Sequence, residues 1–77
     1  MLDFARALIL AGQAEEAELR LRPIPAGLHP SRSVYLAQSL IEQGRTDGAR
    51  AVVAEGLRLF PEDARLLGQE QQLSGDA

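Results

Sequence analysis

The stretch LAQSLIEQGRTDGARAVV, residues 36–53, repeats a pattern that already occurs upstream in FARALILAGQAEEAELRL, residues 4–21. In both copies a large apolar residue, an alanine, a leucine, a glycine, a second alanine and an aliphatic residue follow at equal spacing. Gly12 and Gly44 therefore stand 32 positions apart. Repeats of this length are typical of helical solenoids, whose units pack only on their neighbours. We predict an all-α fold of antiparallel helix pairs that works by presenting a surface.

The composition limits the classes of protein to which the chain can belong. Its 77 residues suffice for one domain, with 45% hydrophobic and 25% charged residues, an ordinary globular balance. The absence of cysteine excludes a disulfide framework and thiolate zinc sites. A net charge of −3 argues against nucleic acid as a partner, because such proteins carry a basic patch. We expect a small fold held together by packing alone.

The sequence also bears on source and location. All eight basic residues are arginine, and lysine and asparagine are absent, which we interpret as the codon bias of a bacterial genome rich in G and C. No apolar run approaches the roughly 20 residues that span a bilayer, and the N-terminus lacks the features of a signal peptide. We expect no membrane insertion, and we favour a soluble, cytoplasmic location. The periodicity begins almost at Met1, which indicates a piece of a longer protein.

Two helices are expected in the first copy. The first covers residues 2–11, and Gly12 stands where a left-handed C-terminal cap is needed. The second begins after Gln13 and ends before Pro23, since proline cannot donate a backbone hydrogen bond. Its three glutamates lie near its N-terminus, where the helix dipole favours negative charge, and this explains them better than an acidic docking patch does. These glutamates are Glu15, Glu16 and Glu18.

Two longer helices are expected in the second copy. A connector over residues 23–29 precedes Pro30, which suits the first turn of a helix that runs to Gly44. We predict that Thr46 caps the next helix and that Pro61 closes it.

A fifth helix, typical of a polar capping helix, is expected after Pro61. Glu62 and Asp63 favour its N-terminus, and residues 74–77 are expected to form a frayed end. Its expected apolar face consists of Ala64, Leu66, Leu67 and Leu73. We treat residues 1–77 as one domain, divided into a first copy with connector (1–29), a second copy (30–63) and the capping helix with its tail (64–77).

The second copy resembles one tetratricopeptide repeat over its 34 residues, 30–63. Three positions depart from the family pattern: Ser33 stands where tryptophan is favoured, Ala37 where glycine is, and Gly56 where alanine is. The upstream copy resembles a degenerate repeat, because Pro23 cuts its second helix short. The residues that match are Leu36, Leu40, Gly44, Ala49, Val53, Leu57 and Pro61.

The resemblance implies a concave face lined by the first helix of each pair. This face mixes apolar and polar groups, as grooves for peptides or helices do. Family members that clamp a carboxylate use lysine and asparagine, which this chain lacks, so that mode is disfavoured. The residues predicted to contact a partner are Leu2, Arg6, Ile9, Val34, Tyr35, Gln38, Ile41 and Glu42.

Alternatives stay open for several of these residues. Ile9, Val34 and Ile41 are equally well explained as core residues or as contacts to further repeats. Tyr35 is the only tyrosine, and tyrosine on an accessible face is enriched at interfaces. The alternative is that Tyr35 covers the connector.

The sequence does not indicate a set of catalytic residues. His29 has no orienting partner in the sequence, and no serine lies in a Gly-x-Ser-x-Gly turn. We interpret His29 as an exposed loop residue, and we expect no enzyme activity, cofactor or metal site.

The sequence thus favours a protein-interaction module that binds a peptide, a helix or a second copy of itself in a homodimer. An alternative from another class is a structural appendage of a larger bacterial enzyme or envelope assembly protein. The flanking sequence would distinguish the two.

Overall fold

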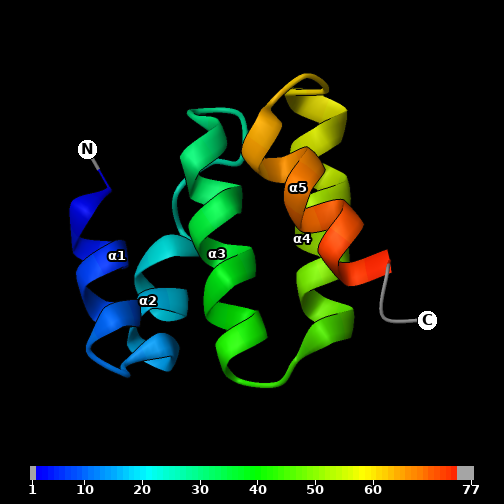
Figure 1. The fold of residues 1–77 in the computed structure, drawn as a ribbon. Coiled ribbons are helices and arrows are strands. Elements are labelled where there is room, and N and C mark those ends of the chain that lie inside the picture. The colour runs from blue at the N-terminus through cyan, green and yellow to red at the C-terminus, as the bar shows by residue number, and fades with distance from the viewer. Residues whose placement is uncertain (1, 75–77) are drawn as a thin grey trace.

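Five helices follow one another in the computed structural model, which describes residues 2–74 (Figure 1). Their number and the all-α fold class are as the sequence predicts, and the boundaries differ from the expected ones by a few residues at most. The helices are α1 (Asp3–Leu10), α2 (Ala14–Leu21), α3 (Pro30–Glu42), α4 (Thr46–Leu59) and α5 (Ala64–Ser74).

The two copies of the sequence pattern form the same turn. Gly12 and Gly44 have φ angles of 80° and 76°, in the left-handed region where only glycine is free of steric cost. In the first turn the amide of Gln13 donates to the carbonyl of Leu8 over 2.8 Å. In the second, the amide of Arg45 donates to Leu40, 32 residues later, over 2.9 Å. The predicted glycine caps are therefore confirmed.

The helix starts match the predictions less uniformly. Pro30 occupies the first turn of α3, and the Asp63 carboxylate caps α5 by accepting from the amides of Arg65 and Leu66. The prediction that Thr46 caps α4 is wrong, because Thr46 is the first helical residue and Arg45 holds the cap position without a side-chain hydrogen bond. The Gly44 turn sets this register, since it places the Arg45 amide on the carbonyl of Leu40.

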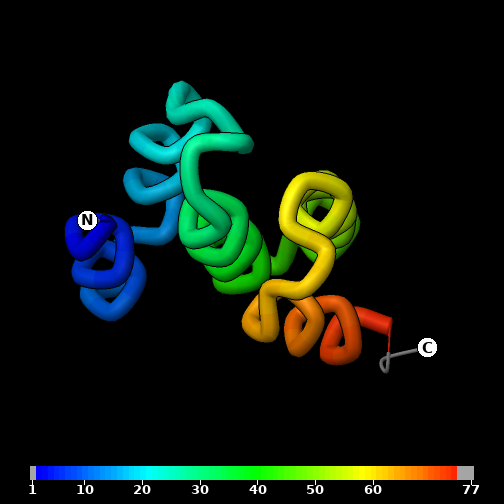
Figure 2. Tube along the Cα trace, turned by 90° about the horizontal axis from the view of Figure 1, so that it is seen from above, coloured from blue at the N-terminus to red at the C-terminus, as the bar shows by residue number. Residues whose placement is uncertain are grey.

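The helices form two rows when the molecule is seen from above. Helices α1, α3 and α5 lie along one side, and α2 and α4 along the other, with α3 set back between α1 and α5 (Figure 2). This arrangement positions the first helix of each pair on a common face. No helix among residues 2–74 combines the length and the apolar character that crossing a bilayer requires.

Small residues allow the paired helices to cross closely. Ala5 and Ala17 in the first pair, and Ala37 and Ala49 in the second, are completely buried. Larger aliphatic side chains fill the space around them. These larger core residues include Leu21, Leu36, Leu40, Val53, Leu66 and Leu73.

The apolar face of α5 differs from the expected one. Leu66 and Leu73 are buried as expected, but Leu67 is 41% exposed and Gln69 takes a buried place instead. Gln69 can do so because its Nε2 donates to the carbonyl of Val34 on α3 over 2.9 Å. Ala64 is also exposed, so two of the four predicted face residues are wrong. Ser74 belongs to α5, contrary to the predicted tail, while residues 75–77 lie outside the described part.

Candidate functional site

A hollow of about 290 Å³ opens between α1 and α3 on the face that these helices share. Its most exposed apolar member is Leu10, with 76% of its surface accessible at the end of α1. Apolar side chains and two polar groups therefore surround one depression. Its lining residues are Arg6, Ile9, Leu10, Val34, Tyr35 and Gln38.

A second hollow, of about 200 Å³, adjoins the first where the connector meets the starts of α1 and α3. Tyr35 lines both hollows, so the two meet at this residue. We call the two together the α1–α3 groove. The second hollow is lined by Leu2, Asp3, Ile24, Leu28, His29, Ser31, Arg32 and Tyr35.

Most of the predicted contact residues lie in this groove. Leu2, Tyr35 and Ile41 all pack against the core. Leu2 also lines the second hollow, whereas Ile41 is half-buried and lines neither hollow, which favours the core interpretation for Ile41. Glu42 also lies outside the groove and accepts a 3.4 Å hydrogen bond from Gln38. Tyr35 borders both the connector and the face shared by α1 and α3. The predicted residues that line the first hollow are Arg6, Ile9, Val34, Tyr35 and Gln38.

Seven groove residues are not among the predicted contact residues: Asp3, Leu10, Ile24, Leu28, His29, Ser31 and Arg32. Leu10 follows Arg6 by four residues and therefore lies on the same helix face, a signal that the periodicity carries. Leu28, which is 66% exposed, has no such signal, because it belongs to the irregular connector.

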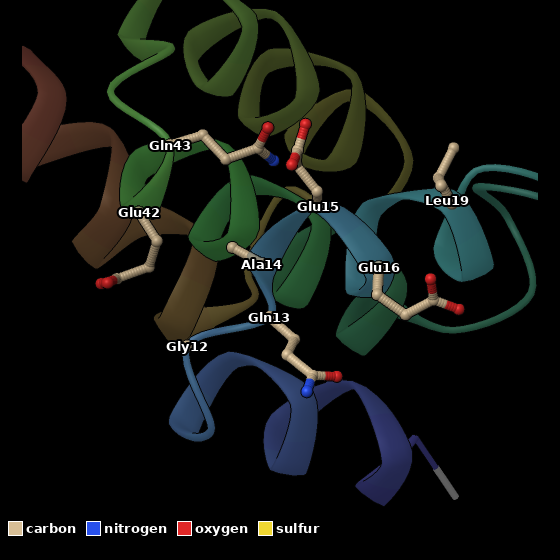
Figure 3. A pocket seen from close by; sticks show the side chains of 8 residues that line it. All are labelled: Gly12, Gln13, Ala14, Glu15, Glu16, Leu19, Glu42 and Gln43. Atoms are coloured by element: carbon tan, nitrogen blue, oxygen red, sulfur yellow. The ribbon is translucent and has the colours of Figure 1, made fainter.

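A further depression lies at the turn between α1 and α2, with a volume of about 840 Å³ (Figure 3). Its side chains do not share one direction. The amide of Gln43 and the carboxylate of Glu15 face each other in this view, whereas Glu42 points away on one side and Glu16 and Leu19 project from α2 in other directions (Figure 3). Among residues 2–74 no group of histidine, cysteine or acidic side chains could hold a metal ion. The depression is therefore large, but its side chains do not point toward one common ligand, and we do not consider it a candidate site.

Glu18 anchors a polar network between α2 and the turn from α3 to α4. Only 7% of this residue is exposed. Its Oε1 accepts hydrogen bonds from Gln43 Nε2 and Arg45 Nη1, both over 2.9 Å, and its Oε2 accepts one from Arg22 Nε over 2.7 Å. Explaining Glu18 by the first turn of α2 is therefore wrong, since Glu18 lies beyond that turn and its buried side chain connects α2 to the turn between α3 and α4.

Two opposing effects act on the pKa of Glu18. Burial by itself would raise its pKa, because desolvation disfavours the carboxylate. The hydrogen bonds from Gln43 and Arg22 and the charges of Arg22 and Arg45 outweigh burial, so the pKa is lowered. Glu18 is thus a charged structural group at neutral pH.

Arg32 and His29 secure the connector. Arg32 Nε donates to the carbonyl of Ile24 over 2.9 Å, and its Nη2 donates to that of Arg22 over 3.3 Å. The Nδ1 atom of His29 accepts from the Ser31 amide over 3.1 Å, which makes His29 the N-cap of α3. The expectation that His29 is merely an exposed loop residue is therefore corrected: it is exposed but has a capping role.

The comparisons with known proteins bear on the second part of the fold, from α3 to α5. A family model described as Tetratricopeptide repeat matches residues 30–73, which is α3, α4 and almost all of α5. Searches among curated proteins and among solved structures give no match. Repeats of this family generally mediate protein–protein interaction and are not catalytic. The matched segment covers more than half of the chain, and the chain therefore belongs to the tetratricopeptide repeat family.

Proposed function

We propose that this chain is a non-catalytic interaction module that binds a segment of a protein in the α1–α3 groove. Membership of the tetratricopeptide repeat family supports a protein as the partner. The observation that carries the choice of surface is the exposed Leu10 beside Tyr35, in a depression that also holds Arg6 and Gln38. Apolar contacts would supply affinity there, and the two polar groups would supply orientation.

The size and arrangement of the two hollows favour side chains of a peptide over a small molecule as the occupant. Sites for drug-sized molecules typically have volumes of roughly 300–1,000 Å³. The first hollow, of about 290 Å³, lies at the lower limit of that range, and the second, of about 200 Å³, lies below it. Each is open to the surface and shares the Tyr35 ring with the other, which suits two side chains that enter from one backbone.

The proposal is tested by panning a display library of random peptides against the purified chain. We expect enriched peptides whose binding is lost in Leu10→Gln. The matched control is Leu19→Gln, because Leu19 is 67% exposed on α2 and lies outside the groove. An absence of enrichment, or equal binding by both variants, would show that the groove is not the binding surface.

A second copy of the chain is one partner that the proposal includes. Light scattering coupled to size exclusion over a concentration series tests this case. A dimer that dissociates in Leu10→Gln, and persists in Leu19→Gln, would identify the occupant of the groove as another copy. A monomer at all concentrations would leave an external segment as the partner.

A further inference from the structure

The connector between α2 and α3 is held at its two ends by side chains of different chemistry. At its start, Arg32 Nε donates to the carbonyl of Ile24 over 2.9 Å. At its end, the Nδ1 atom of His29 accepts from the amide of Ser31 over 3.1 Å. A guanidinium keeps its charge throughout the physiological range of pH, whereas histidine changes its charge between about pH 8 and pH 5. Of these two anchors, only His29 therefore responds to mild acid.

Protonation of His29 is incompatible with its role as the N-cap of α3. Because Nδ1 is the accepting atom, the neutral ring carries its hydrogen on Nε2. The protonated ring has a hydrogen on both nitrogens, so Nδ1 can no longer accept from the Ser31 amide. The positive end of the α3 dipole also disfavours a cation at this position. In mild acid the ring therefore loses its hydrogen bond to α3.

The charged groups around the second hollow give the protonated ring another partner. Asp3, in the first turn of α1, lines this hollow together with His29 and forms no ion pair with a side chain among residues 2–74. Arg32 lines it too, but backbone carbonyls hold its guanidinium, and Glu55 of α4 lies 3.7 Å from its Nη1. Tyr35 is the remaining titratable lining residue, and tyrosine is ordinarily uncharged in this range. Asp3 is therefore the group that attracts the protonated ring.

From these observations we infer that His29 is a pH-sensitive switch in the α1–α3 groove. The neutral ring caps α3, and the protonated ring turns across the second hollow toward Asp3. An imidazole turned into a hollow of about 200 Å³ leaves little room for a partner's side chain. The first hollow is lined by neither His29 nor Asp3 and stays open. The consequence for binding rests on the proposed interaction function, whereas the movement of the ring does not.

Nuclear magnetic resonance of the free chain tests the movement, because His29 is the only histidine and its ring signals are unambiguous. At pH 7.5 we expect a nuclear Overhauser effect between the His29 ring and the Ser31 amide, together with the nitrogen shifts of a ring protonated on Nε2. At pH 5.5 we expect effects between the ring and Asp3 instead. Carboxylates ordinarily titrate near pH 4, so this interval isolates the histidine.

Two variants separate the steps of the switch. His29→Asn keeps a good N-cap side chain that does not titrate, so its Ser31 amide signal should stay in place between pH 7.5 and pH 5.5. Asp3→Asn keeps the histidine and removes the attracting charge, so the ring should leave Ser31 at pH 5.5 without approaching α1. The inference is overturned by a wild-type ring that stays on Ser31 at pH 5.5, or by one that behaves as in Asp3→Asn.

The effect on binding is measured with a library-selected peptide whose binding at pH 7.5 is weakened by Leu28→Gln, since Leu28 lines only the second hollow. Its affinity for the wild type should fall about fivefold at pH 5.5, because the loss of one buried anchor commonly has an effect of this size. Its affinity for His29→Asn should stay unchanged. Equal losses in both proteins would refute control of the groove by His29. A library without such peptides would refute binding in the second hollow and not the movement of the ring.

Discussion

Gly56 and Ser33 meet where α4 crosses α3, and a β-carbon added to Gly56 would lie only 2.8 Å from the β-carbon of Ser33. The same added carbon would lie 3.0 Å from Leu66 Cδ1 on α5. Both residues depart from the family pattern described above, in which larger side chains stand at these positions. The small size of both residues lets three helices approach closely at this point.

Gly56→Ala is expected to destabilise the fold although alanine is the better helix former. The intrinsic gain is about 1 kcal/mol, whereas overpacking of a core typically costs about 1–3 kcal/mol. We expect a net loss of about 1 kcal/mol in the free energy of unfolding, measured by urea denaturation followed by circular dichroism.

Gly68→Ala is the control for this substitution. Gly68 lies within α5, and an added β-carbon would meet nothing within 4 Å. The substitution should therefore stabilise the protein by about 0.5–1 kcal/mol. Equal stabilisation by Gly56→Ala would contradict the close packing of Gly56 on Ser33.

Glu18→Gln is expected to lower the free energy of unfolding by about 1–2 kcal/mol at neutral pH. The substitution removes a buried charge that accepts hydrogen bonds from Gln43, Arg45 and Arg22. The estimate is moderate because the side chains of both arginines remain about half exposed and can be rehydrated. Glu16→Gln is the control, since its ion pair with Arg20 is exposed.

The Glu18 network should also make stability depend on pH. Because the pKa of Glu18 is lowered on folding, its contribution is complete above the unfolded value of about 4.3. The contribution is lost as pH falls through the lower, folded pKa. The difference in unfolding free energy between the wild type and Glu18→Gln should therefore shrink as the pH is lowered from 7 to about 3. A difference that stays constant would show that the charge of Glu18 does not stabilise the fold.

Arg32→Met is expected to destabilise the protein by about 2 kcal/mol, because the carbonyls of Arg22 and Ile24 would lose their donors. Melting curves followed by circular dichroism measure the effect. Arg58→Met, on the exposed face of α4, should change stability by less than about 0.5 kcal/mol. Similar melting temperatures for the two variants would mean that Arg32 does not hold the connector.

Ala49→Leu is expected to cost about 1–3 kcal/mol, because Ala49 is completely buried where α4 crosses α3. Ala51→Leu offers a matched comparison on the exposed side of the same helix. Urea denaturation should show a lower midpoint for Ala49→Leu only. An Ala49→Leu variant as stable as the wild type would mean that the crossing has room for a larger side chain.

The sequence by itself determined the local order of the fold. Gly12 and Gly44 predicted both turns, because the left-handed conformation strongly favours glycine. Pro30 and Pro61 bounded the second pair of helices. These signals are local, since each depends on a residue's own backbone preference or on its helix face, and both can be seen in a single sequence.

The tertiary structure decided which polar residues become buried. Glu18 looked like an ordinary acid at the start of a helix, and its burial depends on Gln43 and Arg45, more than 20 positions away. Gln69 replaced Leu67 on the inner face of α5, because the carbonyl of Val34 was within its reach. Burial of a polar group depends on whether a distant partner meets it, and only the folded chain brings such partners together.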